Sequence, residues 1–101
     1  MIYHLTQLIY IKNGKEQVFH AFEEYVLPLL EKYRGELVYR VRPPETAFLA
    51  GNQELPYEIH FIRFDSEPDL QDYMMDEERK KYLHLKEESV RSTFIVKGVK
   101  L

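Results

Sequence analysis

Glu58 and His60 stand two residues apart in the segment "PYEIHFIRF", residues 56–64, so in an extended chain they share a face. A histidine titrates near neutrality, which makes His60 a candidate general acid or base in a pocket. A structural role is the alternative, in which His60 is hydrogen-bonded to Glu58, Arg40 or a water inside a polar subunit interface.

Arginine and tyrosine supply the candidate ligand-binding groups. Arg40 and Arg63 can recognise a carboxylate or phosphate, because a guanidinium binds these groups through two parallel hydrogen bonds. Ion pairs with Glu58 and other acidic residues are the structural alternative. Tyr39 is expected to line a pocket, because its hydroxyl would need a partner beneath the helices.

Composition excludes several classes of function. The chain has 101 residues, 45% hydrophobic and 31% charged, which predicts a single globular domain over residues 1–101. The net charge of −3 and the absence of an aromatic RNA-binding motif argue against nucleic acid. Cysteine is absent, and His4 has no second ligand at metal-binding spacing, so we predict no metal and no cofactor. No apolar run is long enough for a membrane span and no targeting signal is visible, so a cytoplasmic location is expected.

Changes of hydrophobic period predict the elements. Residues 2–11, 36–42, 57–64 and 92–100 alternate or are rich in β-formers, and they are expected to be strands. Residues 15–34 carry an apolar stripe at helical spacing, with a kink expected at Pro28 and a C-terminal cap at Gly35. Ser66 is a predicted helix N-cap, and a charged, solvated segment is expected to restart at Asp76. Residues 43–56 are a loop, and Gly98 is a predicted bulge.

The order strand, helix, strand, strand, helix, strand predicts a ferredoxin-like α+β sandwich. Right-handed βαβ crossovers would give an antiparallel sheet in the order 4-1-3-2 with both helices on one face. The helices can cover only that face. The row containing Leu5, Ile9, Tyr39 and Phe61 is the more apolar one and is predicted to face them.

The other row mixes apolar and titratable side chains, of a kind that monomers rarely leave in water. We predict that a symmetric homodimer covers it, sheet against sheet. The predicted interface residues are His4, Leu8, Tyr10, Arg42, Glu58, Ile62, Phe64 and Ile95.

Three segments resemble the dimeric α+β barrel superfamily: "FEEYVLPLLEKYRGELVYR" (22–40), "YEIHFIRFDSEPDLQDYM" (57–74) and "DEERKKYLHLKEESV" (76–90). The chain is similar to its small uncharacterised members of the DUF1330 type and to the antibiotic-biosynthesis-monooxygenase type. Asp65 stands where proline is usual in the first type. The chain also has no tryptophan, which departs from members that degrade haem.

The resemblance implies a homodimer with a small-molecule pocket between sheet and helices in each subunit. Two functions are then open. One is a binding or structural protein without turnover. The other is a cofactor-independent monooxygenase, cyclase or isomerase for an aromatic or polyketide-like substrate, with His60 or His84 as acid or base and an Arg or Tyr stabilising an enolate.

Overall fold

The structure, a computed structural model, describes residues 2–101. Strands and helices follow one another in the predicted order, and the connection after β2 contains one further 3-10 turn. Their bounds are β1 (Tyr3–Ile11), α1 (Glu16–Val26), η1 (Leu27–Tyr33), β2 (Gly35–Val41), η2 (Glu45–Ala47), β3 (Glu58–Phe64), α2 (Glu67–Met74), α3 (Glu77–Lys80), α4 (Leu83–Ser89) and β4 (Val90–Val99).

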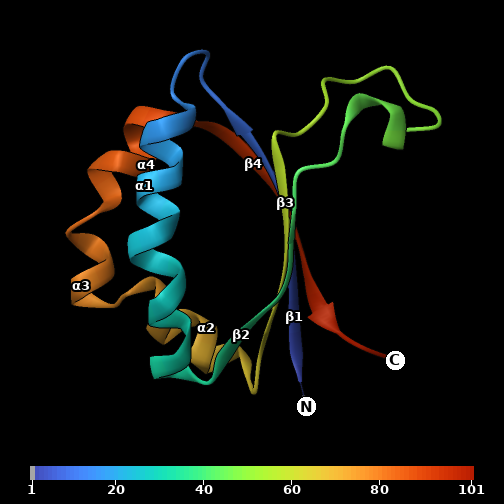
Figure 1. Cartoon of the computed structure of the whole chain (residues 1–101). Coiled ribbons are helices and arrows are strands. Elements are labelled where there is room, and N and C mark those ends of the chain that lie inside the picture. The colour runs from blue at the N-terminus through green and yellow to red at the C-terminus, as the bar shows by residue number, and fades with distance from the viewer. Residues whose placement is uncertain (1) are drawn as a thin grey trace.

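The four strands form one antiparallel sheet in the order β2-β3-β1-β4, which is the predicted order read from the opposite edge. The helices α1 to α4 all lie on one side of this sheet, and none of these four covers the other side (Figure 1). The predicted ferredoxin-like α+β architecture is therefore confirmed. The long connection between β2 and β3 projects beyond the sheet on the uncovered side (Figure 1).

The structure shows a change of helix type near Pro28, and not the predicted kink within a single α-helix. The α-helix ends at Val26, and a 3-10 helix with Pro28 near its start continues to Tyr33. Proline cannot donate a backbone hydrogen bond, so it suits the first turn of a new helical segment. The predicted cap at Gly35 is wrong, because Arg34 adopts the left-handed conformation at φ 57°. Gly35 is instead packed against Phe64. A Cβ atom at position 35 would lie only 2.7 Å from the Phe64 ring, which is too close for two carbon atoms.

Two side-chain caps start the second group of helices. The Ser66 hydroxyl accepts a hydrogen bond from the Asp69 backbone amide, as predicted. The Asp76 carboxylate accepts one from the Arg79 amide and also pairs with Lys32 at 2.8 Å, which ties α3 to η1. The segment after Asp76 is predicted to be mostly solvated, but Arg79 within it is buried.

The register between strands overturns the predicted assignment of faces. Leu5 pairs with Ile62, and directly opposed residues share a face, so the even-numbered residues of β3 lie beneath the helices. A register shift at Val38 then turns Arg40 toward His60 on the same face. Tyr39 and Phe61 consequently lie on the uncovered face. The predicted bulge at Gly98 is absent, and the irregularity of the β1–β4 ladder lies between Tyr10 and Ile11.

This register corrects the predicted interface. Glu58, Ile62 and Phe64 are buried beneath the helices of their own subunit, so they cannot form the uncovered face. Arg42 turns toward Glu58, and Ile95 pairs with Gln7 on the helix side. His4, Leu8 and Tyr10 remain on the uncovered face. It also carries the exposed apolar residues Tyr39, Val41, Phe61, Phe94 and Val96.

Candidate functional site

A buried carboxylate on β3 gathers three cationic or titratable partners. Glu58 is fully buried, and its two oxygens accept hydrogen bonds from Arg40 Nε and Arg42 Nε, each at 2.8 Å. His60, the next residue on the same face, also donates to Glu58 through Nε2. The bulge at Val38 is what places both arginines over the helix-side face of β3. The sheet therefore presents a fixed network of charges to the helix layer.

Glu23 approaches this network from α1. It lies on the buried stripe of that helix, four residues after Phe19 and three before Val26. Its Oε2 lies 3.6 Å from Nε2 of His60, which is beyond hydrogen-bonding distance. That oxygen is buried and has no hydrogen-bond partner among the described residues. An unpartnered buried carboxyl oxygen is rare, and a catalytic role is one of the few reasons for keeping one.

The two glutamates have opposite electrostatic environments. Burial raises the pKa of Glu23 to about 7, and attraction to His60 only partly offsets this. Burial also acts to raise the pKa of Glu58, but hydrogen bonds from His60, Arg40 and Arg42 outweigh it and lower that pKa to about 2. Glu58 is thus ionised at neutral pH, whereas the pKa of Glu23 lies close to neutrality. Two neighbouring carboxyl groups with separated pKa values are typical of acid–base sites.

Glu23, Glu58 and His60 are spaced as metal ligands are, but the charges around them do not suit a metal ion. One ligand atom each from Glu23, Glu58 and His60 all lie within 4.8 Å of one another. Arg40 and Arg42, however, already occupy both oxygens of Glu58, and their positive charges would repel a divalent cation. The arrangement is better suited to holding and moving a proton.

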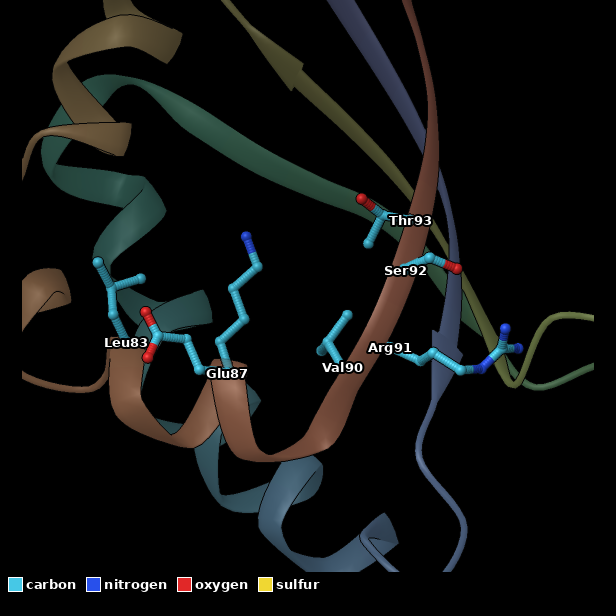
Figure 2. Close-up of a pocket in the computed structure, with 7 residues that line it drawn as sticks. Leu83, Glu87, Val90, Arg91, Ser92 and Thr93 are labelled. Carbon is cyan, nitrogen blue, oxygen red and sulfur yellow. The ribbon is translucent and has the colours of Figure 1, made fainter.

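A cleft opens at the β4 edge of the sheet, where the helix layer separates from the strand. Helix α4 runs directly into β4, and the two diverge from Val90 to form an open cleft of about 370 Å³. Figure 2 shows Val90 and Thr93 of β4 facing α4 across the cleft, while Arg91 extends to the far side of the strand. Lys86 of α4 also lines the cleft, and the charges of Arg79 and Glu23 both act on its pKa. The charge of Glu23 thus acts on a side chain of the cleft, although Glu23 itself is not part of the lining.

The structure brings together only some of the residues singled out in the sequence. His60, Arg40, Arg42 and Glu58 are in contact or share one cluster, although Arg42 and Glu58 were expected in the subunit interface. His84 is exposed on α4, whereas His60 is buried, so the two histidines do not form one site.

Tyr39 and Arg63 lie outside the cluster. Tyr39 is 65% exposed on the uncovered face, not beneath the helices, because the bulge at Val38 reverses its direction. Arg63 pairs with Glu36 at 3.2 Å near the surface. His4 lies beside Arg63 in the ladder, on that same face.

Sequence reasoning missed Glu23 and Arg79. The signal for Glu23 was a charged residue within the apolar stripe of a helix, which is costly to bury without a purpose. Arg79 belongs to a run of charges that normally indicates a solvated helix face, yet its guanidinium lies over the Tyr73 ring at 5.1 Å.

Comparisons with known proteins address the fold. No protein-family model matches the chain, and no curated protein matches its sequence. A protein of unknown function from Rhodopseudomonas palustris superposes with a TM-score of 0.85 at 14% identity, covering 99% of this chain and 82% of that one. A dimeric protein of unknown function and ferredoxin-like fold from Bacteroides fragilis gives 0.69 at 16% identity, covering 96% and 94%. The fold is ferredoxin-like.

A third solved structure has a description of the monooxygenase type. It is a Bacteroides thetaiotaomicron protein provisionally described as an antibiotic biosynthesis monooxygenase, with a TM-score of 0.70 at 14% identity over 99% of this chain and 89% of that one. Structures of the expected superfamily type are therefore among the matches, and at this identity they share the fold alone. None of the helices in residues 2–101 combines the length and apolar character that a membrane span requires.

Proposed function

We propose that this ferredoxin-like chain is a cofactor-independent proton-transfer enzyme of the isomerase or cyclase type, acting on a small organic molecule. Glu23 removes a proton from an acidic carbon of the substrate and returns it at another position. The unpartnered, buried Oε2 of Glu23, 3.6 Å from His60, is the observation that supports this role. A general base works best when its pKa lies near the working pH, and burial raises the pKa of Glu23 to about 7.

The other residues of the cluster hold His60 in place beside Glu23. His60 is held by the ionised Glu58, and Arg40 and Arg42 hold Glu58 in turn. His60 thus lies between a carboxylate that stays charged and a carboxyl that titrates. It is a positioning residue that stabilises the ionised form of Glu23 after proton abstraction, since the two groups attract each other.

Hydrogen–deuterium exchange at carbon tests the proposal without knowledge of the natural substrate. Small ketones, with and without a carboxylate group, would be incubated with the protein in D₂O and followed by NMR. We expect exchange above the buffer rate, with a pH profile that has an apparent pKa of about 7. Because general acid–base catalysis contributes about 10² to 10⁴-fold, Glu23→Gln should reduce the enzymatic rate at least about 100-fold.

Glu24→Gln is the matched control, because Glu24 is the next residue of α1 and is exposed. The Glu24→Gln variant should catalyse hydrogen–deuterium exchange at the wild-type rate. Equal rates for wild type and Glu23→Gln would refute the catalytic role. A ligand bound without any exchange would favour the other candidate function, a small-molecule binding protein.

We also propose that two copies assemble through their uncovered sheet faces. Tyr39, Phe61, Phe94 and Val96 are between 38% and 65% exposed on that face. Burying apolar area stabilises association by about 25 cal/mol per Å². The face has no single dominant charge, which suits a self-complementary contact around a two-fold axis.

Phe61→Asp is expected to convert the dimer to a monomer, because β3 is a central strand and the charge would be buried against the partner. Light scattering coupled to size-exclusion chromatography would measure the mass at micromolar concentration. Met75→Asp is the control, since Met75 is 63% exposed beyond the end of α2, on the helix side. A monomeric wild type, or a dimeric Phe61→Asp variant, would contradict the proposed assembly.

A further inference from the structure

The cleft between α4 and β4 has the composition of a small-molecule binding site. It is lined from α4 by Leu83, Lys86 and Glu87, and from β4 by Val90 and Thr93. Leu83 and Val90 give it apolar walls, and Thr93 supplies a hydroxyl (Figure 2). Small-molecule sites usually have this composition, with mainly apolar walls and a few polar groups that fix orientation.

The cleft exists because the helix layer stops short of the sheet edge. Thr93 and Ile95 pair with Ile9 and Gln7 of β1, so they are on the side that faces the helices. Ile9 is buried there, yet Ile95 remains 45% exposed. The helix-side face of β4 is therefore available to a ligand rather than filled by the protein's own side chains.

Lys86 is the cation in this cleft that has no anionic partner. Within residues 2–101 the ion pairs of lysine side chains involve Lys32 and Lys80, so no carboxylate lies within 4.0 Å of the Lys86 amine. Arg91, the other cation of the lining, is already paired with Glu54. The charge of Lys86 is thus left for a group that the chain itself does not provide.

The neighbours of Lys86 strengthen the case for an anion. Burial and the positive charge of Arg79 both lower the pKa of Lys86, while Glu23 raises it. The positive charges of Lys86 and Arg79 therefore repel each other, and a bound anion would reduce this repulsion.

We propose that the α4–β4 cleft binds a small organic carboxylate, with Lys86 as the group that pairs with the carboxylate. The apolar part of the ligand packs between Leu83 and Val90. This inference goes beyond the proposed function, because Glu23 is not among the residues that line the cleft.

Glu87 defines the orientation of the ligand. It lines the cleft from α4 next to Lys86, and its negative charge repels a carboxylate. The acid group is therefore directed to Lys86, and a neutral or cationic end of the ligand is tolerated near Glu87. Dicarboxylates should accordingly bind less tightly than monocarboxylates of the same size.

Benzoate and benzamide are suitable probes, because they have the same shape and differ in charge. Titration followed by NMR chemical-shift changes should show benzoate binding to the wild-type protein with shifts in α4 and β4, and at least about tenfold weaker binding of benzamide. Lys86→Gln should weaken benzoate binding about tenfold or more, since a charge-assisted hydrogen bond is lost. Lys86→Arg keeps the charge and should bind benzoate within a few-fold of wild type.

Lys80→Gln is the control, because Lys80 is an exposed lysine on α3 that pairs with Glu77 at 3.3 Å. It should leave benzoate affinity unchanged. Acetylation of lysines, read by mass spectrometry, gives a second measurement on the unmodified sequence: benzoate should protect Lys86 and not Lys80. If benzoate and benzamide bind equally, if benzoate does not bind at millimolar concentration, or if Lys86 is not protected, the inference is wrong.

Glu23→Gln separates this inference from the proposed function. Benzoate binding in that variant should persist, because Glu23 does not line the cleft. Carboxylate binding with no carbon exchange in wild type would leave the binding site standing and remove the catalytic proposal. Exchange that depends on Glu23, with no benzoate binding at Lys86, would keep the catalytic proposal and refute the binding site.

Discussion

Glu23→Gln is expected to make the protein more stable by about 2 to 3 kcal/mol at pH 8, while changing little at pH 5. Glu23 has a pKa of about 7 in the folded protein against a usual value of 4.5. The folded state therefore binds more protons than the unfolded state between these values, and wild-type stability falls as the pH rises through this window. Glutamine cannot ionise, so the variant does not lose stability in this way. Each pKa unit corresponds to about 1.4 kcal/mol.

Urea unfolding at a series of pH values and one protein concentration measures this effect. The concentration is held constant because association would contribute to apparent stability. Glu24→Gln, at the exposed neighbouring position, should keep the wild-type pH dependence. A variant Glu23→Gln with the same slope as wild type between pH 5 and pH 8 would show that Glu23 does not titrate there.

Glu58→Gln is expected to lower the free energy of unfolding by about 3 kcal/mol at neutral pH. The substitution removes the charge that three partners share and leaves Arg40, Arg42 and His60 facing a neutral amide. Breaking a buried ion pair on one side typically costs about 3 to 5 kcal/mol. The lower end applies because the arginine side chains are 32% and 46% exposed and can be hydrated.

The pH dependence of Glu58 has the opposite sign to that of Glu23. Its pKa is lowered to about 2, so its contribution is complete above 4.5 and is lost as the pH falls from 4.5 toward 2. Glu36→Gln is the control, because Glu36 forms an exposed pair with Arg63 and should change stability by less than about 0.5 kcal/mol. Equal effects of the two substitutions would contradict the role given to Glu58.

Local sequence signals were sufficient for the elements and their order. Alternation in the strand segments, the proline within residues 15–34 and the Ser66 cap each depend on a few neighbouring residues. Chain connectivity then limited the topology, because right-handed crossovers leave few arrangements of four strands. For these reasons the sheet order and the single helix layer could be predicted, and the structure confirms both.

The faces of the sheet could not be predicted in the same way. Periodicity assigns residues to two rows within one strand, but a shift of one residue between strands exchanges the rows. The even-numbered row of β3 was assigned to the subunit interface because it contains Glu58 and His60. The structure buries these residues beneath the helices, where Arg40 and Arg42 neutralise Glu58.

The sequence by itself thus determined which segments are helices and strands, and which fold they form. Only the tertiary structure decided that Glu23 meets His60, that the bulge at Val38 brings Arg40 to Glu58, and that Lys86 lines an open cleft. The physical reason is the range of the interactions. Secondary structure depends on neighbours along the chain, whereas a buried charge is stabilised by partners that lie far away in sequence and come together only through strand register and helix packing.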